Sequence, residues 1–110
     1  NAYGCTAKVE INEGYPVTIN TSMESDIAIE VAKKVVKTKA VKDNLAPSMG
    51  AEDFAYMLEK KPGAYIWLGA GEGKSGCMLH NSKYDFNDEI IPLGISYWYN
   101  LVENQLSVES

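Results

Sequence analysis

The first part of the chain alternates between apolar and polar side chains. Ala7, Val9 and Ile11 lie on one side of an extended backbone, and the residues between them are polar. This period of two predicts a strand over residues 6–12 with one face in contact with water. After a break that contains glycine and proline, residues 17–19 resume the extended pattern.

The pattern then changes to the period of an amphipathic helix. Thr21, with Glu24 three residues later, fits the capping box that begins many helices. Ile27, Val31 and Val35 follow on one helical face. Lysines gather near the end of this segment, where cations interact favourably with the helix dipole. We interpret them as a solvated face rather than as an anion site.

The middle of the chain predicts a βαβ unit. A short strand near residues 40–42 leads through a loop to a second helix, which Ser48 could cap. Pro62 and Gly63 should stop this helix. Residues 64–69 are a continuous apolar run of strand length, which is typical of central strands covered on both faces. Strand, helix and buried strand in this order indicate a right-handed crossover and an α/β fold.

An irregular segment and a final helix complete the pattern. Residues 70–87 are rich in glycine and polar side chains, and a loop of this length is usually functional. It leaves the carboxyl end of the predicted buried strand, where open α/β sheets bind their ligands. The last helix should begin between residues 88 and 92. Its apolar stripe consists of Ile91, Ile95, Trp98, Val102 and Leu106.

Composition narrows the function classes. The 110 residues are enough for one domain, and 45% hydrophobic with 23% charged residues is an ordinary globular balance. The net charge is −5 and all ten cations are lysines, so we expect no nucleic-acid partner. No apolar run approaches the ~20 residues of a membrane span, so we expect no membrane partner. Cys5 and Cys77 form no disulfide framework and suit a cytoplasmic location.

The irregular segment at residues 70–87 carries the residues that could most readily bind a metal ion or take part in catalysis. His80 is the single histidine, and Asp85 or Asp88 could fix its tautomer if it binds a metal ion. A lone loop histidine is more often a surface residue, so both interpretations stay open. Cys77 could be a ligand or nucleophile, although a small buried apolar role is commoner.

The remaining motifs have simple alternatives. Asp85, Asp88 and Glu89 could form an acidic metal site, but Asn87 and Asp88 more simply cap the last helix. The run Asn20-Thr21-Ser22 fits the acceptor pattern for N-glycosylation. A catalytic metal site needs at least three protein ligands, which this chain does not supply convincingly. We therefore expect at most one piece of an active site.

Two runs carry a resemblance to a known family. They are SMGAEDFAYMLEKKPGAYIWLGAG (residues 48–71) and GCMLHNSKYDFNDEIIPLG (residues 76–94), supported by GYPVTIN (residues 14–20). The chain closely resembles the C-terminal part of the N-acyl-amino-acid amidohydrolases, which include hippurate hydrolases, aminoacylase-like enzymes and auxin-conjugate hydrolases. Because residues 1–4 also look like the end of a helix, we expect the chain to be the back part of a longer protein.

The resemblance implies an α/β fold with two parts. Residues 21–110 would be the C-terminal part of a catalytic domain, a helix-flanked sheet that holds two metal ions. Residues 1–20 would be the last strand of a ferredoxin-like satellite domain and the crossing back from it. The substrate would be a small N-acyl amino acid. The apolar strand at residues 64–69 would lack its neighbours here, so we also expect the chain to self-associate, as a homo-oligomer, or to be conformationally loose.

The resemblance also assigns site residues. His80 matches the family's final histidine ligand, and Gly50 and Glu52 are assigned to substrate binding. Glu52 matches a characteristic acid at the edge of the active site, where it would position other groups, but an acid in the first turn of the second helix is an equally open interpretation. The general base and the other ligands of two divalent ions (zinc, manganese or cobalt) match nothing here, so we expect the chain alone to be inactive and to bind no metal tightly. Two alternatives stay open: a free-standing small binding module, and a small enzyme that uses Cys77 with His80.

Overall fold

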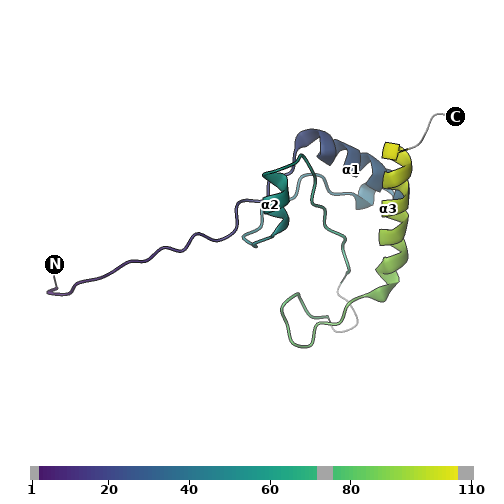
Figure 1. Ribbon diagram of the computed structural model, residues 1–110. Coiled ribbons are helices and arrows are strands. Elements are labelled where there is room, and N and C mark those ends of the chain that lie inside the picture. The colour runs from purple at the N-terminus through teal and green to yellow at the C-terminus, as the bar shows by residue number, and fades with distance from the viewer. Residues whose placement is uncertain (1–2, 72–75, 107–110) are drawn as a thin grey trace.

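Two long helices lie side by side and form the body of the protein. The computed structural model describes residues 3–71 and 76–106. Its elements in chain order are α1 (Ser22–Val35), η1 (Thr38–Ala40), α2 (Phe54–Leu58), η2 (Asp88–Ile90) and α3 (Ile91–Leu106). α1 packs against α3, whereas α2 lies near the start of α1 and the N-terminal segment projects away from the body (Figure 1).

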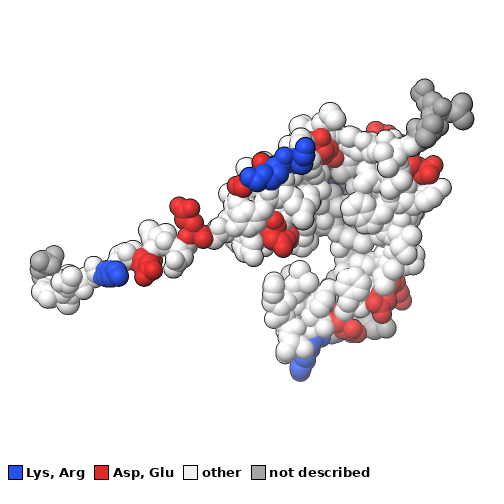
Figure 2. Space-filling model, viewed as in Figure 1, with Lys and Arg blue, Asp and Glu red and all other residues white. Residues whose placement is uncertain are grey.

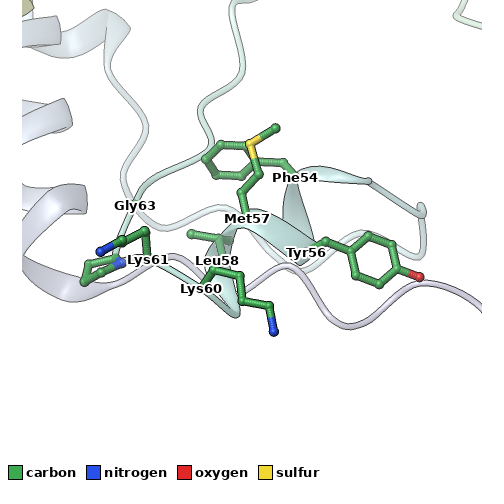
Figure 3. A pocket seen from close by; sticks show the side chains of 8 residues that line it. Phe54, Tyr56, Met57, Leu58, Lys60, Lys61 and Gly63 are labelled. Atoms are coloured by element: carbon green, nitrogen blue, oxygen red, sulfur yellow. The ribbon is translucent and has the colours of Figure 1, made fainter.

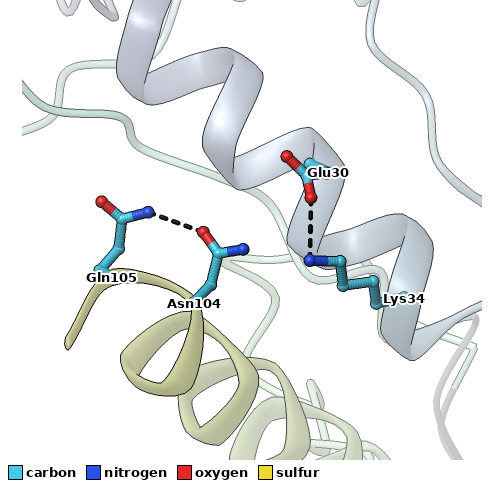
Figure 4. A network of polar contacts seen from close by, with 4 residues as sticks. All are labelled: Glu30, Lys34, Asn104 and Gln105. Carbon is cyan, nitrogen blue, oxygen red and sulfur yellow. Dashed lines mark hydrogen bonds and ion pairs between the residues drawn. The ribbon is translucent and has the colours of Figure 1, made fainter. Parts of the chain in front are cut away.

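The first predicted helix is confirmed. α1 begins after Thr21, as predicted. The Thr21 hydroxyl donates to the Glu24 carboxylate, but neither side chain caps a backbone N–H of the helix start, so the predicted capping box is not formed. The lysines at its end lie in solvent, and Lys34 forms an ion pair with Glu30 one turn earlier at 2.8 Å (Figure 4). Such an exposed pair stabilises a helix only slightly. In the face shown in Figure 2, basic side chains lie among acidic ones, which fits a solvated face.

A small core joins the helices. Val31 of α1 is fully buried, and Ala28 of α1 and Tyr97 of α3 are buried with it. The last helix is confirmed, but the predicted stripe is not its buried face, because Ile95 is 64% exposed. Two residues along a helix correspond to a rotation of about 200°. Ile95 and Tyr97 therefore lie on opposite sides, and α3 packs through the side that carries Tyr97.

The second helix is shorter than predicted. α2 begins at Phe54, so Ser48 does not cap it, and it ends at Leu58 before the expected stop. Ala55 is its buried residue. The backbone passes close by after the helix ends, since a Cβ added to Gly63 would come within 3.2 Å of Leu58 Cδ2. Glycine allows this approach.

The predicted sheet is absent from residues 3–71 and 76–106. Val9 and Ile11 of the first predicted strand are about four-fifths exposed, at 79% and 83%. The third predicted strand overlaps η1, and residues 64–69 form no strand ladder. A strand needs the backbone of a neighbour for its hydrogen bonds, and the described residues supply none. The α/β sheet and the satellite strand are thus not confirmed, and the boundary at residue 20 stays a prediction.

The described part of the chain is extended for its length. Its radius of gyration is 19.7 Å, and the principal extents are 76, 37 and 21 Å. A compact domain of this size would have a radius of gyration of about 13 Å. Large apolar side chains such as Trp67 and Trp98 remain 63% exposed. No helix in the described ranges is long and apolar enough to cross a membrane.

Candidate functional site

His80 stands at the corner of a turn. The Asn81 N–H donates to the Met78 carbonyl at 3.3 Å, and the Tyr84 N–H donates to the Asn81 carbonyl at 2.9 Å. Among the described residues, His80 is the one non-glycine residue with a positive φ, at 67°. A left-handed backbone is costly for most side chains, although histidine enters it more readily than most. The turn leaves the imidazole exposed to solvent.

The loop that carries His80 is tied at its base. The Asn87 side-chain amide donates to the Ala70 carbonyl at 3.1 Å and accepts from the Glu89 N–H at 3.1 Å. The first bond joins the two ends of the irregular segment, and the second caps η2. Asn87 is therefore a cap, as predicted, but the element that it caps is the short η2 before α3 and not α3 itself. Because η2 leads directly into α3, the loop is anchored to the start of the last helix.

The described residues do not assemble a metal-binding group. Within residues 3–71 and 76–106, no three side chains from histidine, cysteine, aspartate and glutamate lie close enough to hold a metal ion. The acidic site suggested for Asp85, Asp88 and Glu89 is accordingly not formed. His80 offers one exposed ligand, whereas a complete metal shell needs at least three from the protein. These residues by themselves do not fit a dinuclear centre.

Glu52 sits at the start of α2. Its Oε1 accepts a hydrogen bond from the Phe54 N–H at 3.2 Å. A hydrogen bond from the Tyr65 hydroxyl and the one from Phe54 lower the pKa of Glu52 below the ordinary glutamate value. The same contact raises the pKa of Tyr65, because its proton is held by an anion. Glu52 is thus a half-buried carboxylate that stays ionised at neutral pH.

A pair of reciprocal contacts fixes Tyr65. The Asn20 side chain donates to the Tyr65 carbonyl at 2.9 Å and accepts from the Tyr65 N–H at 2.8 Å. Next to it, the Thr21 N–H donates to the Gly63 carbonyl at 3.0 Å, and the Gly63 N–H donates to the Thr21 hydroxyl at 2.9 Å. Sequence reasoning missed Tyr65, because it lies within an apolar run, and noted Asn20 only as a glycosylation pattern.

Gly50 and Cys77 have less defined surroundings. Gly50 is exposed, and a Cβ added there would meet only the Ser48 Oγ, at 4.0 Å. Space therefore does not require glycine here in the structure. Cys77 is half-buried. Between described residues, no hydrogen bond or ion pair links His80 to Gly50 or Glu52, which lie on a different segment from the loop.

An apolar hollow of about 570 Å³ lies along α2 and the turn that follows it. Figure 3 shows Phe54 and Met57 on one side of the helix and Tyr56 directed away from them. The full lining is Phe54, Tyr56, Met57, Leu58, Lys60, Lys61, Pro62 and Gly63. The hollow is open to solvent and offers few polar groups that could orient a ligand, so it is not a candidate catalytic pocket.

Comparisons with known proteins identify the family. The model for peptidase family M20/M25/M40 matches residues 5–104. The chain is 38% identical over 94 residues to a hippurate hydrolase of Campylobacter jejuni. The matched region covers 86% of this chain and 24% of that protein. It is 37% identical over 98 residues to thermostable carboxypeptidase 2 of Saccharolobus solfataricus, and this match covers 84% of this chain and 23% of that protein.

A third relative has a different named activity, and the matched region again covers most of this chain and about a quarter of the relative. N-acetyldiaminopimelate deacetylase of Pediococcus pentosaceus is 28% identical over 107 residues, which is 96% of this chain and 27% of that protein. The chain therefore spans about a quarter of the length of the curated relatives it matches. No solved structure matches it. The family match covers most of the chain and agrees with the resemblance carried by residues 48–71 and 76–94, so the chain belongs to peptidase family M20/M25/M40.

Proposed function

We propose that the chain is the C-terminal part of a metal-dependent amidohydrolase that cleaves the amide bond of N-acyl amino acids. The observation that carries this proposal is the identity of 38% to a protein named hippurate hydrolase. A deacetylase and a carboxypeptidase, by their names, also act on acylated nitrogen or on the carboxyl end of a peptide. The shared chemistry is hydrolysis of an amide close to a free carboxylate.

In this proposal His80 supplies one ligand to a centre of two divalent ions, with zinc, manganese and cobalt as candidates. Its support is the exposed imidazole at a turn with a positive φ, since unusual backbone conformations gather at functional sites. The other ligands and the general base come from the remaining three-quarters of the longer protein. Bound metal ions would polarise the scissile carbonyl.

Glu52 and Gly50 contact the substrate in this proposal. The Glu52 carboxylate is ionised and held by the Phe54 N–H, so it can accept a further hydrogen bond from an N–H of the substrate. The open space beside Gly50 allows a substrate to approach the backbone. Neither residue carries the bond-breaking step.

The proposal extends to assembly and location. The exposed apolar side chains of the described residues favour burial against other protein surface, either the rest of the longer enzyme or a second copy, and we include a homo-oligomer in the proposal. The acidic charge and the absence of arginine support a small-molecule substrate rather than a nucleic acid or membrane surface. We place the enzyme in the cytoplasm.

The test uses the full-length protein encoded by the reading frame that contains this chain. Purified enzyme would be incubated with N-benzoyl, N-acetyl and longer N-acyl amino acids, with zinc, manganese or cobalt added in turn. Metal-dependent release of the free amino acid is expected. A full-length protein that binds no metal and hydrolyses none of these amides would contradict the proposal and favour a binding module.

A further inference from the structure

The Asn20 side chain makes the same pair of hydrogen bonds to the Tyr65 backbone that a neighbouring strand would make with its own backbone. Its amide offers one donor and one acceptor, and both are used on the backbone of the same residue, at 2.9 and 2.8 Å. The two residues are 45 positions apart in sequence. This arrangement fixes the position of Tyr65 relative to the beginning of α1 although no strand is present there.

Tyr65 in turn contacts the segment that carries Glu52. Its ring lies 5.6 Å from the Phe54 ring and 5.8 Å from the Trp67 ring, centroid to centroid. Phe54 donates its backbone N–H to Glu52 at 3.2 Å. The Tyr65 side chain lowers the pKa of the same carboxylate. The carboxylate of Glu52 is therefore held by Phe54, and the Phe54 ring packs against Tyr65, so the position of Tyr65 bears on where Glu52 lies.

We propose that Asn20 is a positioning residue for Glu52, acting through Tyr65. This inference rests on the proposed substrate role of Glu52. It also gives the Asn20-Thr21-Ser22 motif a structural use, because the Nδ2 atom that would carry a glycan donates to the Tyr65 carbonyl instead.

The first test changes one atom of Asn20 in the full-length enzyme. Asn20→Asp keeps the acceptor for the Tyr65 N–H but places an oxygen against the Tyr65 carbonyl. The loss of one hydrogen bond and the new repulsion should raise KM for an N-acyl amino acid by about fivefold or more, with kcat within about twofold. The matched control is Asn100→Asp, which loses a similar 2.8 Å bond to the Ser96 carbonyl within α3 and should leave KM unchanged.

The second test removes only the hydroxyl of Tyr65. Tyr65→Phe keeps the backbone pairing with Asn20 and the contact with Phe54. The groups that face Glu52 are Tyr65 and Asp53. Without the Tyr65 hydroxyl the pKa of Glu52 should rise, so the acidic limb of the pH profile of 1/KM should move to higher pH. A residue with a merely structural role would not move this limb.

The outcomes separate this inference from the proposed function. An unchanged KM in Glu52→Gln would overturn the substrate role of Glu52 itself. A raised KM in Glu52→Gln together with wild-type KM in Asn20→Asp would overturn the positioning role of Asn20. If Asn20→Asp does not fold, Asn20→Ser removes the amide without adding charge and is judged by the same KM. An unmoved acidic limb in Tyr65→Phe would overturn the link from Tyr65 to Glu52.

Discussion

The exposed turn around His80 allows its chemical role to be separated from its structural one. Two substitutions in the full-length enzyme serve this purpose. His80→Ala removes the imidazole and keeps a Cβ in the left-handed conformation, whereas His80→Gly removes the imidazole and the steric cost of that Cβ together. If His80 is a ligand, both variants lose metal and turnover, but they differ in the stability of the metal-free protein.

The expected magnitudes follow from exposure and from the φ of 67°. An exposed side chain contributes little packing, so His80→Ala should change the free energy of unfolding of the apo protein by less than about 0.5 kcal/mol. The left-handed conformation costs a non-glycine residue about 1–2 kcal/mol. Glycine relieves this but makes the unfolded chain more flexible, at a cost of about 0.4–1 kcal/mol. The difference leaves His80→Gly more stable than His80→Ala by about 1 kcal/mol.

The assay measures bound metal, turnover and urea unfolding of the apo protein for both variants. Loss of a direct ligand should weaken metal binding more than about 100-fold, since even the partners of ligands contribute 10- to 100-fold. Lys83→Ala is the matched control, because it lies in the same exposed loop and only its backbone N–H is used, by Asn81. Retained metal with more than about a tenth of normal turnover would refute the ligand role. Apo destabilisation by more than about 2 kcal/mol in His80→Ala would indicate a structural histidine instead.

Other expectations concern the core, the isolated chain and pH. Val31→Ala should destabilise the full-length protein by about 2 kcal/mol in urea unfolding, because Val31 is fully buried, whereas exposed Met49→Ala should have no measurable effect. The isolated 110-residue chain should hydrolyse no N-acyl amino acid with any added metal, and metal-dependent turnover would contradict this. At high concentration it should sediment as more than a monomer, and a compact monomer would count against the exposed apolar surface as an association surface. The Glu52 pKa is lowered in the folded state, so its stabilising contribution should be present at neutral pH and be lost as pH falls through that lowered pKa; in Tyr65→Phe the contribution should be smaller and its loss should be complete at a higher pH.

Sequence periodicity was sufficient for the elements that depend on local contacts. α1 begins where Thr21 and Glu24 indicate, and α3 begins within the predicted range, because helical hydrogen bonds join residues four apart. The capping role of Asn87 could also be predicted from sequence, because a cap bonds to a backbone N–H only two residues away. Family membership followed from runs of residues and needed no geometry.

Contacts between distant residues were decided by the tertiary structure alone. An apolar stripe shows that a helix has a face to bury, but it does not say which neighbour is present, and α3 packs through Tyr97 rather than through the side of Ile95. The predicted strands need neighbours that the described residues do not supply, so their pattern alone could not place them in a sheet. The bond between Asn20 and Tyr65 spans 45 residues. No local period could reveal it, because it exists only where the chain folds back on itself.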